Sequence, residues 1–389
     1  MNAPITTTHA AVPDAWRATL SALCANLVGV GLARFAFTPL VPALVAGHWF
    51  SASQAAYLGS ANFAGYLAGA LLAQPISTRF APAAVLCAMM TLAAVSFLTC
   101  VQPLPFPWFA LWRAAAGVAG GLIMVLSATL VLQHVPAPKR GLAGGIIFSG
   151  VGVGVIIAAA AVPRLVALGL PAAWVSLGIL SLILTAIAWS GWPADAAGQG
   201  VREKPPVNKA VLVLFGVYAL NAIGLVPHTM FLVDMAAREL GYGIAAGSAL
   251  WLLYGIGAIL GPVISGKAGD AGGFRPVLLA MLLLQAAAVG LAGVTTNLWA
   301  LALSAFVMGG CTVGIAPVVL GRVRELIPHD PRGQRAVWSL ATTAFAIGQA
   351  GGAFALSGVL GSVGHYSPLF DISAAALLLA FVIKLLGRK

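Results

Sequence analysis

The sequence predicts an all-α integral membrane protein in which twelve transmembrane helices form two pseudo-symmetric bundles of six. Three observations lead to this fold class. Of the 389 residues, 61% are hydrophobic and only 7% are charged, whereas about 25% of the residues of soluble proteins are charged. The apolar residues form segments of about 20 residues or more, long enough to cross a bilayer. The basic residues lie almost entirely between these segments.

Six helices are expected on each side of one long polar stretch, PADAAGQGVREKPPVNK, at 193–209. Its Gly, Pro and charged residues are typical of a linker. The first bundle is expected at 16–192, with helices at 16–44, 55–76, 83–101, 106–132, 141–162 and 172–192. The second is expected at 210–386, with helices at 210–235, 245–265, 276–293, 298–320, 336–356 and 368–386. Residues 1–15 and 387–389 are left as cytoplasmic tails.

The basic residues predict the orientation. If the N-terminus is cytoplasmic, 16 of the 20 Lys and Arg residues fall in cytoplasmic segments, and only Arg164 and Arg238 fall outside. This bias follows the positive-inside rule. The first apolar segment is too long for a secretory signal and has no basic residue before it, so it is expected to remain as a helix. We therefore expect a multi-pass protein of a bacterial inner membrane with both termini cytoplasmic.

Several function classes are excluded by the sequence. The net charge of +11 lies in loops and therefore does not indicate nucleic-acid binding. Four scattered cysteines, without histidines at ligand spacing, give neither a metal site nor a disulfide framework. The GVGVG run lies in an expected membrane helix and lacks the strand of a nucleotide fingerprint. No cofactor and no ATP-driven pumping are expected, and the partners are a small-molecule substrate, an ion gradient and the lipid bilayer.

Arg34 is the main candidate for a functional residue, because it lies near the middle of the first apolar helix. An arginine there costs about 2.5 to 3.5 kcal/mol on insertion scales and normally faces a protein interior or a wet cavity. Its planar donors suit a carboxylate or phosphate. No acidic residue lies deep in an apolar segment, since Asp234 and Asp371 lie near predicted outer ends. The unbalanced positive charge favours an anionic substrate. The alternative is that Arg34 is a structural pin held by backbone carbonyls.

Other polar and aromatic side chains within the helices are candidates for lining the substrate path, although helix packing explains them equally well. Their spacing places several on shared helical faces. The substrate-binding candidates besides Arg34 are Asn26, Thr38, Asn62, Tyr66, Asn221, Trp338 and Thr342. His228 follows Pro227 in the seventh helix, and its imidazole titrates near physiological pH. It is therefore a candidate for proton coupling, with a packing role as the alternative.

The two halves also echo each other weakly, with GLAR in the first helix answered by GLVPH in the seventh. The 6+6 layout, the loop GKAGDAGGFR at 266–275 and the RAAAG run that begins at Arg113 resemble the major facilitator superfamily (MFS). The stretch GVGLARFAFTPLVPAL resembles its YbfB/YjiJ-like branch. The resemblance implies a gating role for Asp270 and Arg275, proton coupling or a helix contact for Arg113, and a monomer that can function. In the corresponding first-half loop, Ala73 and Ser77 replace the signature Gly and Asp.

Together these observations predict a secondary transporter, not an enzyme. It would move a small, anionic organic substrate by alternating access around a midplane site, with coupling to protons. Three alternatives remain open: an exporter of amphipathic drugs or metabolites with the same fold, a membrane enzyme acting on lipid-linked substrates, and a sensor that binds without transport.

Overall fold

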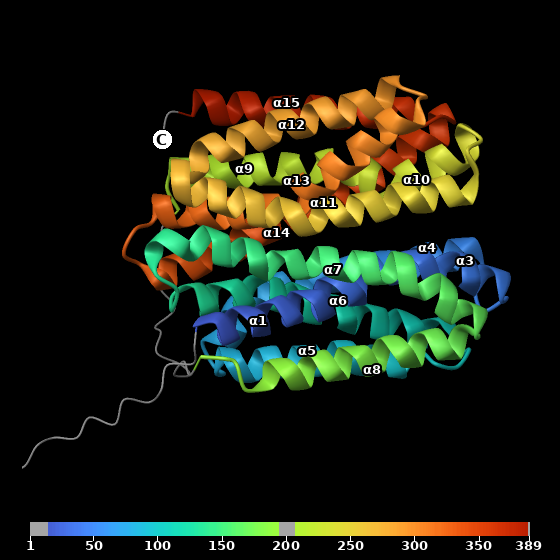
Figure 1. Cartoon of the computed structure of the whole chain (residues 1–389), viewed down its shortest axis with the longest axis horizontal. Coiled ribbons are helices and arrows are strands. Elements are labelled where there is room, and N and C mark those ends of the chain that lie inside the picture. The colour runs from blue at the N-terminus through green and yellow to red at the C-terminus, as the bar shows by residue number, and fades with distance from the viewer. Residues whose placement is uncertain (1–14, 194–206, 388–389) are drawn as a thin grey trace, which may run out of the picture.

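The computed structural model describes residues 15–193 and 207–387, and all regular elements in these ranges are helices (Figure 1). They group into twelve rods that run roughly parallel or antiparallel to one another. Ten rods are long and apolar enough to cross a membrane. The other two are α4 (Ala52–Ser77) and the shorter apolar helix α5 (Pro82–Leu98). The predicted linker residues 194–206 and most of both tails lie outside the described residues.

The first six rods form the lower half of the molecule in Figure 1. The first rod is interrupted and consists of α1 (Ala15–Asn26), the π-helix η1 (Leu27–Leu32), α2 (Ala33–Phe35) and α3 (Phe37–Ala46). It is followed by α4, α5, α6 (Phe106–Leu132), the short 3₁₀ turn η2 (Ala137–Lys139), α7 (Arg140–Ala167) and α8 (Leu170–Trp189).

The last six rods form the upper half. The seventh rod mirrors the first in being interrupted: it consists of α9 (Lys209–Gly224), the π-helix η3 (Pro227–Phe231), α10 (Leu232–Asp234) and the π-helix η4 (Met235–Glu239). It is followed by α11 (Gly243–Gly272), α12 (Phe274–Val294), α13 (Leu298–Leu326), α14 (Pro331–Val363) and α15 (Ser367–Leu386).

Local capping residues explain where several helices begin. Ser51 and Gln54 form a reciprocal capping box at the start of α4. Asn297 caps α13, and Asp330 followed by Pro331 begins α14. The α6 bounds agree with the predicted 106–132. The predicted helices at 245–265 and 298–320 were too short, because α11 continues to Gly272 and α13 to Leu326. Most of the GKAGDAGGFR motif is therefore helical.

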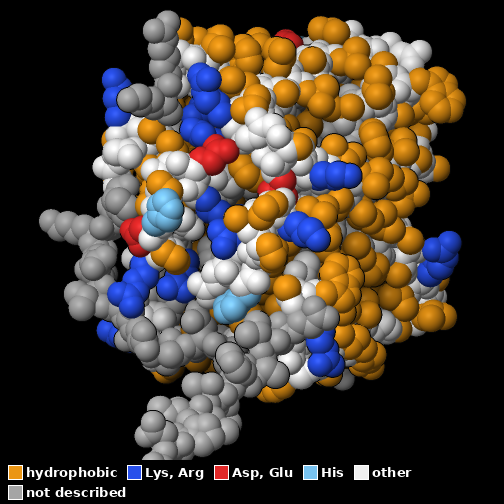
Figure 2. Space-filling model, turned by 60° about the vertical axis from the view of Figure 1, so that its left-hand side comes forward, with side chains coloured by type: hydrophobic (Ala, Val, Ile, Leu, Met, Phe, Trp, Pro, Cys, Tyr) orange, Lys and Arg blue, Asp and Glu red, His pale blue; other side chains and the backbone are white. Residues whose placement is uncertain are grey.

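Charged side chains gather at one end of the helix bundle, called the basic end below (Figure 2). The start of α1, the end of α15 and the α4–α5, α6–α7, α11–α12 and α13–α14 connections lie there. Exposed basic residues at this end include Arg79, Lys139, Lys209, Lys267 and Arg332. The flank of the molecule in Figure 2 is an apolar surface. This division suits a protein that lies in a bilayer with its charged end in water.

The two halves approach most closely along α7 and α11, where glycines replace side chains. A Cβ added to Gly152 would lie 2.4 Å from the Ala258 carbonyl carbon, and one added to Gly145 would lie 2.2 Å from the Pro262 oxygen. At the basic end, a Cβ on Gly141 would lie 2.2 Å from the Gly266 oxygen. Small residues let membrane helices pack backbone against backbone. The glycine run of α7 therefore has a packing function along the seam between the halves.

We predict that Gly152→Ala destabilises the protein by about 1–3 kcal/mol, because the added methyl group overpacks the α7–α11 seam. Thermal unfolding of the purified protein measures this loss. The control is Gly216→Ala in α9, where an added Cβ meets no atom within 4 Å. The control should be neutral or stabilising by up to about 1 kcal/mol. Equal stability of the two variants would contradict the close contact.

Candidate functional site

The π-helix η1 places Arg34 between the two halves. Within η1, Gly31 packs against α7, and a Cβ added to Gly31 would lie 2.9 Å from the Gly154 Cα. π-helical turns often mark functional sites, because they interrupt the regular ladder of backbone hydrogen bonds. The chain returns to α-helical geometry at Ala33, and Arg34 follows directly. Its side chain is half-buried, in contrast to the closely packed residues on either side.

Arg34 makes a hydrogen bond that joins the halves. Its Nη2 donates to Oε1 of Gln349 on α14 at 2.7 Å. The partner is a neutral amide, which leaves the positive charge of the guanidinium uncompensated by this contact. A charged acceptor would make a stronger bond to the same donors.

Aromatic rings surround the rest of the guanidinium. Its central carbon lies 4.6 Å from the ring centre of Phe63, 5.2 Å from that of Phe35 and 5.8 Å from that of Tyr66. From the other half, the ring centre of Trp251 lies 6.2 Å from that of Phe35 and 4.9 Å from that of Tyr254, on which it stacks. Cation–π contacts stabilise a buried cation without neutralising it.

No carboxylate pairs with Arg34 in the described part of the chain. Asp234 accepts a hydrogen bond from the hydroxyl of Tyr366, and Glu239 accepts one from the Tyr366 backbone N–H at 3.1 Å. Asp371 is exposed on α15. The hydrogen bonds described here for Asp234 and Glu239 thus lie within the second half. The site between the halves carries net positive charge.

Arg113 on α6 lies next to Arg34 in space but has a different environment. Its Nη1 donates to the Ala33 carbonyl at 2.7 Å, its guanidinium carbon lies 4.1 Å from the Phe37 ring, and it is 3% exposed. The interrupted first rod is thus held by Arg113 immediately before Arg34. This contact agrees with the predicted link between the first and fourth helices.

The three candidate asparagines are buried within the halves. Asn26 donates to the Ser127 hydroxyl at 2.9 Å, and Asn62 donates to the Arg113 carbonyl at 3.1 Å. In the second half, Asn221 donates to Gln285 at 2.5 Å. All three are at most 2% exposed. In this conformation, each joins neighbouring helices of one half, and none contacts Arg34.

The other substrate-binding candidates lie at different depths along the interface. Trp338 is fully buried, donates from its indole to the Met124 carbonyl at 3.3 Å and stacks on Tyr218. Thr342 is buried one turn later and donates to the Trp338 carbonyl. Thr38 is exposed. Of these predicted candidates, only Tyr66 lies directly against Arg34, while Trp338 and Thr342 lie nearer the basic end.

His228 points into the second half. Its Nε2 lies 2.7 Å from the Ser304 hydroxyl, which itself donates to the Ala288 carbonyl at 2.6 Å. A hydroxyl has one proton, so Nε2 of His228 donates and the buried Nδ1 is left without a partner in the described residues. The structure does not bring His228 to Arg34.

Asp270 joins the two halves at the basic end. Its carboxylate accepts hydrogen bonds from the backbone N–H groups of Gly141 and Leu142 at 2.7 and 2.8 Å. A carboxylate at the start of α7 complements the free N–H groups and the helix dipole there. Ser339 adds a bond to the Ala70 carbonyl at 2.9 Å. Arg275 is not part of this contact between the halves, because its Nη2 lies 3.4 Å from the Leu385 carbonyl in its own half.

Sequence reasoning missed the aromatic residues Phe63, Trp251 and Tyr254 of the Arg34 site. It did not miss Gln349, because helical spacing places Gln349 on the same face as Trp338 and Thr342 and makes it a candidate for lining the substrate path. Phe63, Trp251 and Tyr254 carry no polar or charge signal that separates them from lipid-facing or core aromatics. The described residues contain no group of three metal-ligating side chains.

Comparison with known proteins identifies the family. Residues 26–385 match the family described as "Uncharacterised MFS-type transporter YbfB". The chain belongs to this family of MFS transporters. The transporter is also 24% identical over 385 residues to a "Chloramphenicol resistance protein" of Streptomyces lividans, a match that covers 92% of this chain and 94% of the relative.

Solved structures confirm the predicted MFS fold. The proton:xylose symporter XylE bound to 6-bromo-6-deoxy-D-glucose matches with a TM-score of 0.77 at 16% identity, over 95% of this chain and 94% of the symporter. The human organic anion transporter MFSD10 (TETRAN) matches with a TM-score of 0.75 at 16% identity, over 96% of this chain and all of that protein. MFS proteins are transporters that bind small molecules within a lipid bilayer, which excludes the enzyme alternative.

We predict that Asp270→Asn opens the basic end of the transporter. The loss of a charged hydrogen-bond acceptor is worth about 1.5–3 kcal/mol. The rate at which a hydrophilic maleimide labels Ser339→Cys should therefore rise roughly tenfold in the Asp270→Asn background. The four native cysteines are buried and should give little background. Asp371→Asn, at the other end of the molecule, is the control. Unchanged labelling would show that Asp270 does not hold this end closed.

Proposed function

We propose that this transporter is a secondary carrier for a small organic anion, with Arg34 binding the substrate's carboxylate or phosphate. The observation that supports the proposal most is the half-buried guanidinium of Arg34, held between the halves by the neutral amide of Gln349. An uncompensated charge in such a setting is costly unless a ligand or water meets it. An anionic substrate supplies the missing partner.

The same contact suggests how binding drives alternating access. A carboxylate that takes the donors of Arg34 displaces Gln349 and thereby removes one hydrogen bond between the halves. Tyr66 borders the anion site directly, and Trp338 and Thr342 line the path towards the basic end. The two halves then rock about this site, with Asp270 holding the basic end closed in one of the two states.

The cellular setting of the carrier belongs to the same proposal. The distribution of basic residues favours a bacterial inner membrane with the basic end and both termini in the cytoplasm. With the basic end closed, the Arg34 site then faces outward. The carrier works as a monomer and uses the proton gradient, with Arg113 and His228 as the groups that couple binding to protonation.

A second candidate function is the export of amphipathic drugs or metabolites. Two observations favour it: the rings around Arg34, which suit a flat or apolar substrate, and the full-length similarity to the chloramphenicol resistance protein. In this function Arg34 remains paired with Gln349 and the rings provide the binding surface.

We predict that Arg34→Gln weakens the stabilisation of the protein by anions. Ligands that bind only the folded state raise its melting temperature. In a screen of carboxylates, phosphates and chloramphenicol, an anion should raise the melting temperature of the wild type. Arg34→Gln should weaken the binding of that anion about tenfold or more. Arg164→Gln, an exposed arginine on α7, is the control. Counterflow in proteoliposomes then establishes transport. If anions still raise the melting temperature of Arg34→Gln, the proposal that Arg34 binds the anion is wrong. If chloramphenicol stabilises the wild type but not Phe63→Ala, the export function is favoured.

We predict that His228→Asn uncouples transport from protons if His228 is the coupling group. The variant should retain counterflow of labelled substrate but lose accumulation driven by an imposed pH gradient. Ser304→Ala, which removes the hydrogen-bond partner of His228 but keeps the imidazole, is the matched control. A parallel loss of counterflow and accumulation in both variants would indicate that His228 only packs the second half.

A further inference from the structure

A second group of basic residues lies at the basic end of the second half, away from Arg34. Arg275 lies at the start of α12, Arg322 near the end of α13 and Lys384 in the last turn of α15. Helix α12 packs against both α13 and α15, which brings these three ends of helices to the same part of the basic end. The ammonium group of Lys384 is within electrostatic range of Arg275, Arg322 and Glu325.

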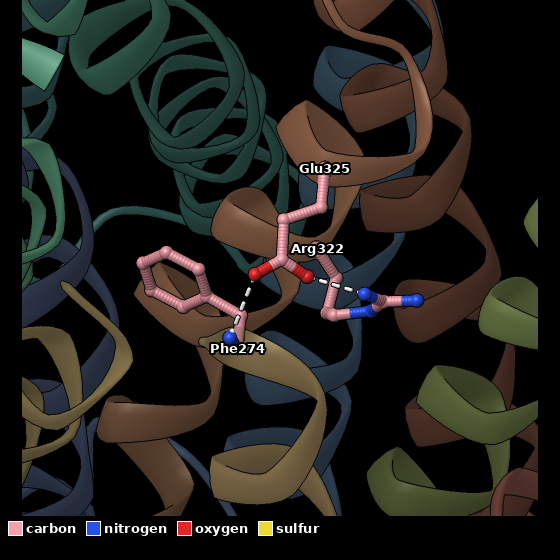
Figure 3. Close-up of polar contacts among 3 residues, drawn as sticks. All are labelled: Phe274, Arg322 and Glu325. Atoms are coloured by element: carbon pink, nitrogen blue, oxygen red, sulfur yellow. Dashed lines mark hydrogen bonds and ion pairs between the residues drawn. The ribbon is translucent and has the colours of Figure 1, made fainter. Parts of the chain in front are cut away.

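Glu325 is the carboxylate of this cluster, and both of its oxygens are already used (Figure 3). Oε2 pairs with Arg322, and Oε1 accepts from the backbone N–H of Phe274 at 2.8 Å. One negative charge therefore faces three positive charges. The carboxylate holds Arg322 in place and caps the start of α12, but it does not bond to Lys384.

Lys384 is the unusual member of the cluster. It is 0% exposed, and its Nζ has no hydrogen-bond partner among the described residues. A lysine near the end of a membrane helix normally extends its ammonium group to water. The Nε atoms of Arg275 and Arg322 are likewise buried without partners in the described part of the chain. The ammonium group of Lys384 carries three N–H donors and each Nε carries one, so five N–H donors of this cluster lack an acceptor among the described residues.

We propose that Lys384, Arg322 and Arg275 form a binding site for a phosphate group. A phosphate supplies several anionic oxygens, which match an ammonium and two guanidinium groups. The surroundings resemble those of a phospholipid head group: Leu385 and Leu386 beside Lys384 are exposed, as are Leu378, Leu379 and Val382 further along α15. Acyl chains can lie on this apolar surface while the phosphate reaches the cations. A soluble phosphate carries the same chemistry without the chains.

The test measures the melting temperature of the delipidated full-length protein in detergent, titrated with dioleoylphosphatidylglycerol or with inorganic phosphate. We expect the lipid to raise the melting temperature of the wild type, and we expect Lys384→Met to weaken the binding of the lipid about tenfold or more. Lys209→Met, an exposed lysine at the same end, should respond like the wild type. A response to the lipid alone identifies the head group as the source, and a response to both probes identifies a site open to soluble phosphate.

Several outcomes would overturn the site. These are an unchanged lipid response in Lys384→Met, an equal loss in Lys209→Met, or a wild type that responds to neither probe. If Lys384→Met does not fold, Lys384→Arg and Arg275→Gln replace it. The lipid response should persist in the first, which keeps the charge, and weaken in the second. A full response in Arg275→Gln would refute the cluster as a phosphate site.

Discussion

The arrangement of this transporter depends on keeping an ionised guanidinium in the interior between two helical bundles. Water is scarce there, and each charge needs a partner or a polarisable neighbour. The chain meets this need for Arg34 with an amide from the opposite half and with rings on several sides, and for Arg113 with a backbone carbonyl beside a π-helix. The first arrangement leaves the charge available to a ligand, whereas the second uses its charge to hold the helix.

Contacts between the halves are unevenly distributed along the molecule. Asp270, Ser339 and Trp338 join the halves towards the basic end, and Arg34 with Gln349 joins them near the middle. Each of these hydrogen bonds lies at Arg34 or between Arg34 and the basic end. In the proposed mechanism of alternating access, this arrangement of contacts corresponds to one of two states. The loss of the Asp270 contacts and the formation of new ones at the other end would produce the second state.

Much of this fold follows from the sequence, because hydropathy and loop charge are local properties. The same local reasoning identified Arg34, since a charge within an apolar helix is visible without knowledge of its neighbours. Local reasoning could mark Tyr66 and Gln349 as candidates, but it could not show that they are partners of Arg34. Gln349 is 315 positions distant in sequence, and which face of its helix meets the first half depends on the packing of all twelve rods. For Asn26 and Asn221, local reasoning predicted a position on the substrate path that the structure does not show in this conformation. Their polarity within apolar helices made them candidates for the substrate path, but it could not indicate that they face helices of their own half.

The seam between α7 and α11 has a mechanical consequence. Where side chains of two helices interdigitate, one helix can move past the other only through successive changes of rotamer. At Gly145 and Gly152 the main chains pack directly against each other, so no side chain of these residues has to change its rotamer. The two halves can therefore tilt about this seam without rearranging the side chains there. The position at which they rest is determined elsewhere, by the polar contacts at the basic end and at Arg34.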